Sequence, residues 1–297
     1  MPNPKFTGSG VALVTPFDAN GVNERVLREL VEFHVAEGTD ALILCGSTGE
    51  AATMSADEQR VAVAGAVAAA GKRIPIIAGC GGSDTKQVAQ LARNARDAGA
   101  DALLISAPPY NKPTQKGILA HYRAVMDAAD LPAIVYNVPG RTSVNILPAT
   151  IEEMAADERV IGVKEACGDI VQIGELARRL ADRLFIWSGN DDQIVPIMSL
   201  GGKGVISVLG NVAPRDTSRM AHAYLDGDVE TARKLQLRYL PLINALFAEA
   251  NPIPVKAAVG WLGFDVGPVR LPLTEITPAI QERMISALTD VGLHPRR

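Results

Sequence analysis

The sequence contains few aromatic residues and few cysteines, and it has no long apolar run. Aromatic side chains make up 4% of the 297 residues, so platforms for stacking nucleic-acid bases are not expected. The formal net charge is -4 and no basic stretch stands out, which also disfavours nucleic acid as a partner. No apolar run approaches the roughly 20 residues that a membrane-spanning helix needs. We therefore expect neither a nucleic-acid partner nor a membrane association.

The cysteine pattern does not indicate a metal site. Cys45, Cys80 and Cys167 are far apart in the chain, and no Cys or His spacing suggests zinc. Each lies in or beside an apolar stretch, where a small buried thiol is expected. Residues 1–5 have no apolar segment of the kind found in signal peptides. The sequence therefore predicts a cytoplasmic protein that uses no metal and no cofactor.

Short apolar stretches alternate along the chain with Ala-rich stretches of helical period. Helices are expected at 26–36, 57–70, 85–98 and 115–129. The expected strands cover residues 11–15, 41–45, 74–78, 102–106, 133–136, 160–164, 184–187 and 204–208. Eight strands that each precede a helix, within about 225 residues, predict a (β/α)8 TIM barrel. A doubly wound open sheet is the alternative, although no GxGxxG follows the first strand as in dinucleotide-binding versions.

The pattern changes after the eighth unit. From residue 228 onward only helical stretches follow, at 231–248, 254–262 and 274–293. No segment rich in Gly, Ser or Pro separates them from the preceding part as a linker would. We therefore predict a barrel with the active site over residues 1–227 and a C-terminal helical extension over residues 228–297.

One lysine ends a strand-like stretch. Residues 160–163 are apolar and rich in β-branched side chains, which indicates a strand covered on both faces, and Lys164 follows. Its ammonium group either reaches water or is desolvated at a site. A desolvated lysine loses its proton more easily, and the neutral amine can attack a carbonyl to form a Schiff base. Because parallel barrel strands all end on the face that holds the site, Lys164 is a candidate nucleophile.

Other strand ends carry groups that suit the same chemistry. The turn at 46–49 contains Ser47 and Thr48, and its hydroxyls and backbone N–H groups either cap a helix or hold a small carboxylate. Tyr136 is either a core tyrosine or a proton shuttle. Arg141 either forms a surface ion pair or presents its guanidinium to a carboxylate.

Several segments resemble the pyruvate-dependent class I aldolases, the superfamily of dihydrodipicolinate synthase and N-acetylneuraminate lyase. The resemblance runs from about residue 6 to residue 293 and is strongest to the dihydrodipicolinate synthase branch. Its most specific parts are Tyr-Asn-Val-Pro-Gly-Arg-Thr at 136–142 and Gly-Val-Lys-Glu-Ala at 162–166. The segments at 6–17, 201–208 and 251–256 are also similar.

The resemblance implies roles for individual residues. Lys164 would form the Schiff base with pyruvate, and Tyr136 would transfer protons. Thr48 would bind the pyruvate carboxylate, while Ser47 would relay protons between tyrosines. The family usually has threonine at position 47, and serine keeps the hydroxyl with a freer side chain.

The resemblance also implies a second substrate and an assembly. Arg141 would hold the carboxylate of L-aspartate 4-semialdehyde, and Gly189 and Ile206 would line the pocket. Tyr110 would enter the neighbouring subunit's site in a tight dimer, and a homotetramer built as a dimer of dimers is expected.

The implied reaction is condensation of pyruvate with L-aspartate 4-semialdehyde, on the way to diaminopimelate and lysine. One alternative is a lyase for a 2-oxo-3-deoxy sugar acid or N-acetylneuraminate, which Arg141 disfavours because a polyhydroxylated tail needs neutral partners. A second is a 4-hydroxy-2-oxoglutarate aldolase or dehydratase, which Arg141 does not exclude. A third is a non-catalytic pyruvate-binding scaffold, which needs neither Lys164 nor Tyr136.

Feedback inhibition by lysine is expected to be weak. In lysine-inhibited relatives the inhibitor lies in a cleft at the dimer interface. The matching positions here are Ala56, Gln59, Ser83 and Gln87, none of which carries the charge that would pair with lysine.

Overall fold

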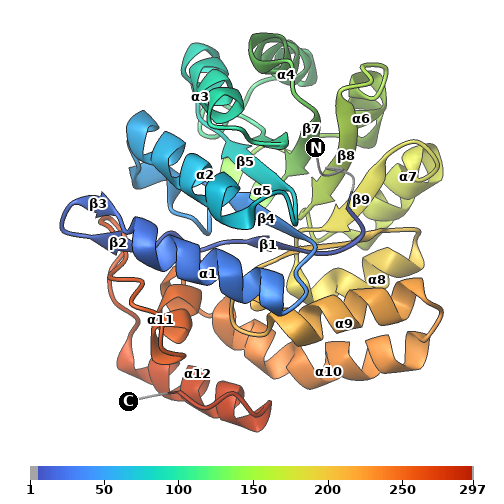
Figure 1. Ribbon diagram of the computed structural model, residues 1–297. Helices are drawn as coiled ribbons and strands as arrows, with labels where there is room; N and C mark the ends of the chain where they lie inside the picture. Colours follow the sequence, from blue (N-terminus) through green and yellow to red (C-terminus); the bar gives the residue numbers. More distant parts are fainter. Residues whose placement is uncertain (1–5, 296–297) are drawn as a thin grey trace.

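A computed structural model describes residues 6–295 and contains a closed barrel of eight parallel strands (Figure 1). In chain order the strands are β1 (Gly8–Ala12), β4 (Ala41–Leu44), β5 (Ile76–Cys80), β6 (Ala102–Ser106), β7 (Ala133–Asn137), β8 (Val160–Glu165), β9 (Phe185–Ser188) and β10 (Gly204–Ser207). β1 pairs with both β10 and β4, which closes the sheet. The predicted (β/α)8 barrel is confirmed, and the open-sheet alternative is excluded. Residues 1–5, where no signal peptide is expected, lie outside the described residues.

Helices surround the barrel in Figure 1. They are α1 (Glu24–Ala36), α2 (Ala56–Ala70), α3 (Thr85–Asp97), α4 (Gln115–Ala129), α6 (Pro148–Met154), α7 (Ile170–Leu180), α8 (Ile194–Ser199) and α9 (Pro214–Leu225). The predicted helices correspond closely to α1 through α4. At the start of α2 the Ser55 side chain accepts from the Glu58 N–H, and the Glu58 side chain accepts from the Ser55 N–H. Over residues 6–295, no helix is long and apolar enough to cross a membrane.

The first strand begins and ends earlier than predicted. The predicted strand includes residues 13–15, but β1 ends at Ala12 and only the Leu13 N–H still donates to the neighbouring strand, at the Ile43 carbonyl. The Val14 N–H donates to Asn211 Oδ1 at 3.0 Å, and the Thr15 hydroxyl donates to the Gly49 carbonyl at 2.7 Å. A short hairpin of β2 (Phe17–Asp18) and β3 (Gly21–Val22) follows, which the sequence did not predict because two-residue strands show no alternation.

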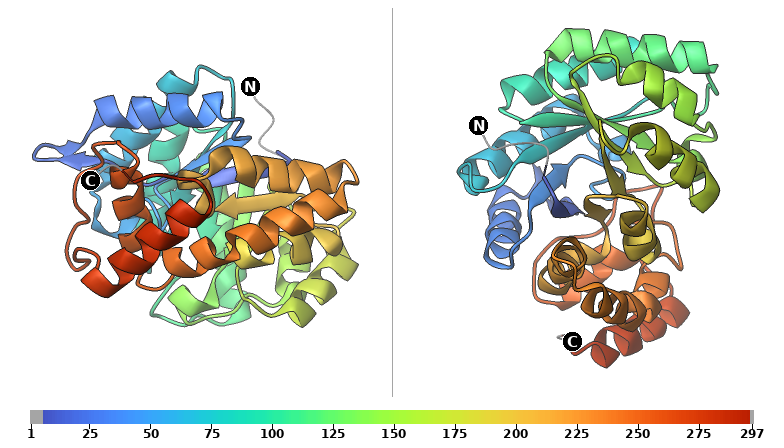
Figure 2. Two further views of the ribbon diagram at one scale, coloured as in Figure 1. Left: turned by 90° about the horizontal axis from the view of Figure 1, so that it is seen from below. Right: turned by 90° about the vertical axis from the view of Figure 1, so that its right-hand side faces the viewer.

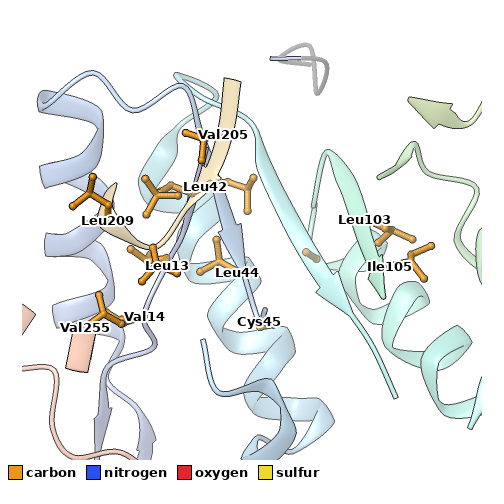
Figure 3. Packing of buried hydrophobic residues seen from close by; sticks show 14 of the residues in the cluster. Leu13, Val14, Leu42, Leu44, Cys45, Leu103, Ile105, Val205, Leu209 and Val255 are labelled. Carbon is orange, nitrogen blue, oxygen red and sulfur yellow. The ribbon is translucent and has the colours of Figure 1, made fainter. Parts of the chain in front are cut away.

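The core has two layers. Alternate residues of a strand point to opposite faces, so Leu42 and Leu44 of β4 belong to the cluster between strands and helices. Ile43 belongs to a second cluster, inside the barrel, that includes Tyr136 and Trp187. Figure 3 shows part of the outer cluster, with Leu42 and Leu44 on the barrel wall. The inner cluster fills the interior of the barrel.

The C-terminal extension consists of α10 (Val229–Leu246), α11 (Ile253–Trp261) and α12 (Pro278–Asp290), and Figure 2 shows all three on one side of the barrel. α10 packs against α9 and α12. Val255 of α11 belongs to the same outer cluster as Val14 (Figure 3). The last helix is shorter than the predicted 274–293 because Pro278 occupies its first turn, where proline is favoured. The boundary at residue 228 stays a prediction.

A buried ion pair joins this extension to the barrel. Lys256 Nζ of α11 lies 2.6 Å from Glu50 Oε1, and the two side chains are 2% and 1% exposed. Lys256 also donates to the Pro268 carbonyl at 2.9 Å and lies 4.2 Å from the centroid of the Phe17 ring. The second carboxylate oxygen of Glu50 accepts from the Arg270 N–H at 2.9 Å. Because Glu50 directly follows the turn at 46–49, the pair fixes that turn.

The ion pair generates a stability prediction. Lys256→Met leaves the Glu50 carboxylate buried without its cation, and we expect the free energy of unfolding to fall by about 3–5 kcal/mol. The double variant Glu50→Gln/Lys256→Met removes both charges and should recover about half of that loss. Urea unfolding followed by circular dichroism measures each value.

The matched control is Lys234→Met, which removes an exposed partner of Glu230 and should change the unfolding free energy by about 0–1 kcal/mol. Equal losses in the single and double variants would show that the buried charge of Glu50 is not the cause.

Candidate active site

Lys164 lies within a layer of the barrel interior. On β8 it is in register with Tyr136 of β7 and Trp187 of β9, so the three side chains point to the same side of the sheet. Lys164 is 5% exposed and Trp187 is fully buried. The strand continues to Glu165, one residue beyond the predicted end. The burial of Lys164 excludes the interpretation in which its ammonium simply extends to water.

Two glycines make room around the lysine. A Cβ on Gly162 would lie 2.3 Å from Cζ3 of Trp187, so only glycine allows the indole to pack there. A Cβ on Gly189 would lie 2.7 Å from the Cβ of Ala166 and 3.2 Å from Cε of Lys164. Gly189 therefore borders the lysine side chain directly. Ile206 is fully buried in the inner cluster, together with Tyr136 and Trp187.

The surroundings of Lys164 favour its neutral form. Burial lowers the pKa of Lys164 to about 7, and the positive charge of Arg141 acts in the same direction, while Asp191 opposes the shift. Its Nζ lies 4.4 Å from the centroid of the Tyr136 ring. A large fraction of this amine is therefore unprotonated at neutral pH and able to attack a carbonyl.

Tyr136 keeps its proton at neutral pH. Burial raises the pKa of its phenol, and the charge of Arg141 and a hydrogen bond with the Ser47 side chain partly oppose the rise. Ser47 itself is exposed at the mouth of the barrel, whereas Thr48 beside it is buried. A protonated phenol next to the amine, with a hydroxyl leading outward, can move protons between the lysine and the mouth.

Thr48 and Arg141 are connected through Asn251. Nδ2 of Asn251 donates to the Thr48 hydroxyl at 2.9 Å, and the Asn251 carbonyl accepts from Nη2 of Arg141 at 3.2 Å. Arg141 lies on the short helix α5 (Pro139–Thr142), and Asn251 lies just before α11. The sequence assigned no role to Asn251, although it opens the similar segment at 251–256.

Asp191 is a second residue to which the sequence assigned no role. It lies three residues after the end of β9, and its carboxylate accepts from the Ser207 hydroxyl at 2.6 Å and from the Val208 and Leu209 N–H groups at 2.9 Å. Burial raises its pKa, while these hydrogen bonds and Lys164 act against the rise. Its position at the end of a barrel strand was the only available signal.

A cavity of about 810 Å³ opens at this end of the barrel, and Ser47, Tyr136, Arg141 and Asn251 line it. It extends past Ala56, Gln59, Gln87 and Pro109. Tyr110 lies outside it, with its side chain 90% exposed and its backbone at φ 69°. Among residues 6–295, no group of three or more His, Cys, Asp or Glu side chains is arranged to hold a metal ion.

Comparisons with known proteins agree with one another. The model of the dihydrodipicolinate synthetase family matches residues 5–291. A relative from Thermoanaerobacter sp. (strain X514), named 4-hydroxy-tetrahydrodipicolinate synthase, is 52% identical over 98% of each chain. The crystal structure of dihydrodipicolinate synthase from Aquifex aeolicus superposes with a TM-score of 0.95 at 40% identity, covering 98% of this chain and 100% of that one. The crystal structure of the chloride-inhibited dihydrodipicolinate synthase from Acinetobacter baumannii complexed with pyruvate superposes with a TM-score of 0.93 at 40% identity. The match covers 97% of this chain and 99% of that one.

The electrostatics of the site predict a pH profile for Lys164. Its reaction with trace acetic anhydride, followed by peptide mass spectrometry, should rise with pH and reach half its maximum near pH 7, because only the unprotonated amine reacts. Arg141→Met removes a positive charge that lowers this pKa, so the midpoint should move to higher pH.

Arg215→Met is the matched control, because Arg215 forms an exposed ion pair with Glu37. An unchanged midpoint in Arg141→Met would contradict the assigned electrostatics, as would an equal shift in Arg215→Met.

Proposed function

Because the chain belongs to the dihydrodipicolinate synthetase family, we propose that it condenses pyruvate with L-aspartate 4-semialdehyde to give 4-hydroxy-tetrahydrodipicolinate. This lyase reaction is a step in the synthesis of diaminopimelate and lysine. The observation that carries the proposal is the buried amine of Lys164, with its lowered pKa, beside the Tyr136 phenol. The name of the relatives favours this reaction over the aldolase, sugar-acid lyase and scaffold alternatives. We also propose a cytoplasmic location, as for a biosynthetic enzyme.

The first half of the proposed reaction forms the Schiff base. The Lys164 amine attacks C2 of pyruvate, and the carbonyl oxygen leaves as water after taking protons through Tyr136. The Thr48 hydroxyl and neighbouring backbone N–H groups meet the pyruvate carboxylate. The complex of the Acinetobacter baumannii relative with pyruvate supports pyruvate as the first substrate.

The second half forms a carbon–carbon bond and a ring. The imine withdraws electrons, so a methyl proton leaves and the resulting enamine attacks the aldehyde carbon of the semialdehyde. Arg141 holds the carboxylate of that substrate through its guanidinium. The amino group of the new chain then adds to the imine carbon, and the bond to Lys164 breaks, which returns the free amine. Protons move through Tyr136, Ser47 and a Tyr110 from a second copy.

We propose that the chain forms a tight dimer in which Tyr110 of one copy completes the site of the other. The loop that carries Tyr110 is held in place, because Ser83 Oγ donates to the Pro109 carbonyl at 3.0 Å and Asn111 Nδ2 donates to the Ser83 carbonyl at 2.9 Å. A fixed and exposed aromatic side chain is typical of a residue buried by a partner. We further propose that two such dimers form a homotetramer, as the resemblance to the family implies.

The reaction can be tested directly. Turnover of aspartate semialdehyde should require pyruvate, measured by coupling to the next reductase and NADPH oxidation. Lys164→Ala should lower kcat/KM by at least about a thousandfold because the covalent route is lost, while Lys234→Ala, on the surface of α10, should match the wild type. If borohydride traps pyruvate on Lys164 but the semialdehyde is not turned over, the proposed second substrate is wrong. The proposed Schiff base with pyruvate is then still supported.

The shared site predicts complementation between two impaired variants. Tyr110→Phe should lower kcat by about 10- to 100-fold because the hydroxyl is lost from the proton relay. Mixing it with Lys164→Ala under conditions that exchange subunits creates mixed dimers. Each mixed dimer has one site with an intact Lys164 and an intact Tyr110 from the other chain, so about a quarter of wild-type activity should return.

If Tyr110 instead acts within its own chain, every site in the mixture carries a defect and no activity returns. Sedimentation of the wild type supplies the assembly state independently, and a fully active monomer would contradict the shared site.

A further inference from the structure

We propose that Asn251 is a positioning residue for the pyruvate carboxylate, acting through the hydroxyl of Thr48. The proposal rests on the proposed function, since it takes pyruvate as the ligand next to Thr48. Asn251 belongs to the C-terminal extension, whereas Thr48 belongs to a turn after the second barrel strand. The extension would therefore set how the barrel binds its first substrate.

The direction of the hydrogen bond carries the argument. Asn251 Nδ2 donates to the Thr48 hydroxyl at 2.9 Å, and within residues 6–295 the Thr48 hydroxyl has no other side-chain hydrogen bond. A hydroxyl that accepts in this way keeps its own hydrogen for donation to an acceptor elsewhere. Thr48 is 3% exposed, so bulk water does not compete for that hydrogen. A carboxylate, which only accepts, is the ligand that this arrangement suits.

The same residue contacts Arg141 by a separate route. The Asn251 backbone carbonyl accepts from Arg141 Nη2 at 3.2 Å, and Arg141 is otherwise on the exposed side of α5. The side chain of Asn251 thus hydrogen-bonds to Thr48, while its backbone carbonyl hydrogen-bonds to Arg141. A substitution of the Asn251 side chain removes the contact with Thr48 and keeps the contact with Arg141. The effect of the Thr48 contact can therefore be measured by itself.

The other end of the Asn251 amide does not explain why the side chain is there. Asn251 is 7% exposed, and its Oδ1 is buried without a hydrogen-bond partner among the described residues. A buried amide oxygen without a partner destabilises a fold. Folding alone would be served as well by an apolar residue, so the donation to Thr48 is the contribution that justifies the amide.

The test is a double-mutant cycle of Asn251 and Thr48, in which KM is measured for pyruvate and for the semialdehyde. Asn251→Ala should raise KM for pyruvate about tenfold, the loss expected when the Thr48 hydroxyl no longer donates a well-placed hydrogen bond to the charged carboxylate. KM for the semialdehyde should change by less than about twofold because the backbone contact with Arg141 remains. In a Thr48→Val background the Asn251→Ala change should add less than about twofold to KM for pyruvate.

A second readout separates positioning from general damage. Borohydride trapping of acetaldehyde, which has no carboxylate, should be unchanged in Asn251→Ala, while trapping of pyruvate at low concentration should fall about tenfold. Should the alanine variant not fold, Asn251→Asp keeps the size but accepts the Thr48 hydrogen, and it should show the same selective loss. Glu249→Ala is the control, because it breaks a contact with Thr277 in the same segment away from Thr48.

The outcomes distinguish the two proposals. Equal losses of pyruvate and acetaldehyde trapping in Asn251→Ala would overturn the role of Asn251. A full rise of about tenfold in KM for pyruvate on adding Asn251→Ala to Thr48→Val would overturn it as well. In both cases trapping of pyruvate by the wild type would still support the Schiff base. Wild-type protein that traps no pyruvate would overturn both.

Discussion

The cost of burying one ammonium group governs how this site is built. Lys164 occupies a barrel layer between Tyr136 and Trp187, where a full positive charge is poorly solvated. The interior reduces that cost by favouring the neutral amine, which is also the form that attacks a carbonyl. Asp191 limits the shift, so the amine is not permanently neutral. The same burial therefore accounts for the packing of this layer and for its reactivity.

The barrel alone does not complete the site. The turn at 46–49 holds the candidate relay and carboxylate-binding hydroxyls, and it is fixed from outside by the Glu50–Lys256 ion pair. Asn251, two residues before α11 begins at Ile253, contacts both Thr48 and Arg141. The extension is thus joined to the substrate end of the barrel by polar contacts and to its wall by apolar ones, such as those of Val255.

Much of the architecture was predictable from local pattern. Apolar strands and amphipathic helices alternate clearly, and Lys164 was recognisable because a cation at the end of a buried strand is costly. Contacts between distant segments were not predictable. No role was predicted for Glu50, Lys256 or Asn251, because nothing local shows what each of these side chains faces. The early end of β1 was missed for the same reason, since Asn211 and Gly49 draw residues 14 and 15 out of the sheet.

The position of the extension late in the chain has a consequence for biosynthesis. A ribosome releases the strand with Lys164 and all eight barrel strands before α11 emerges. Until then the Glu50 carboxylate has no lysine to neutralise it, and the Thr48 hydroxyl lacks its hydrogen bond from Asn251. A nascent barrel therefore carries its nucleophile while the contacts of its substrate-binding turn are still incomplete. Translation order thus delays the complete set of contacts for a carboxylate-bearing substrate until the chain is almost finished.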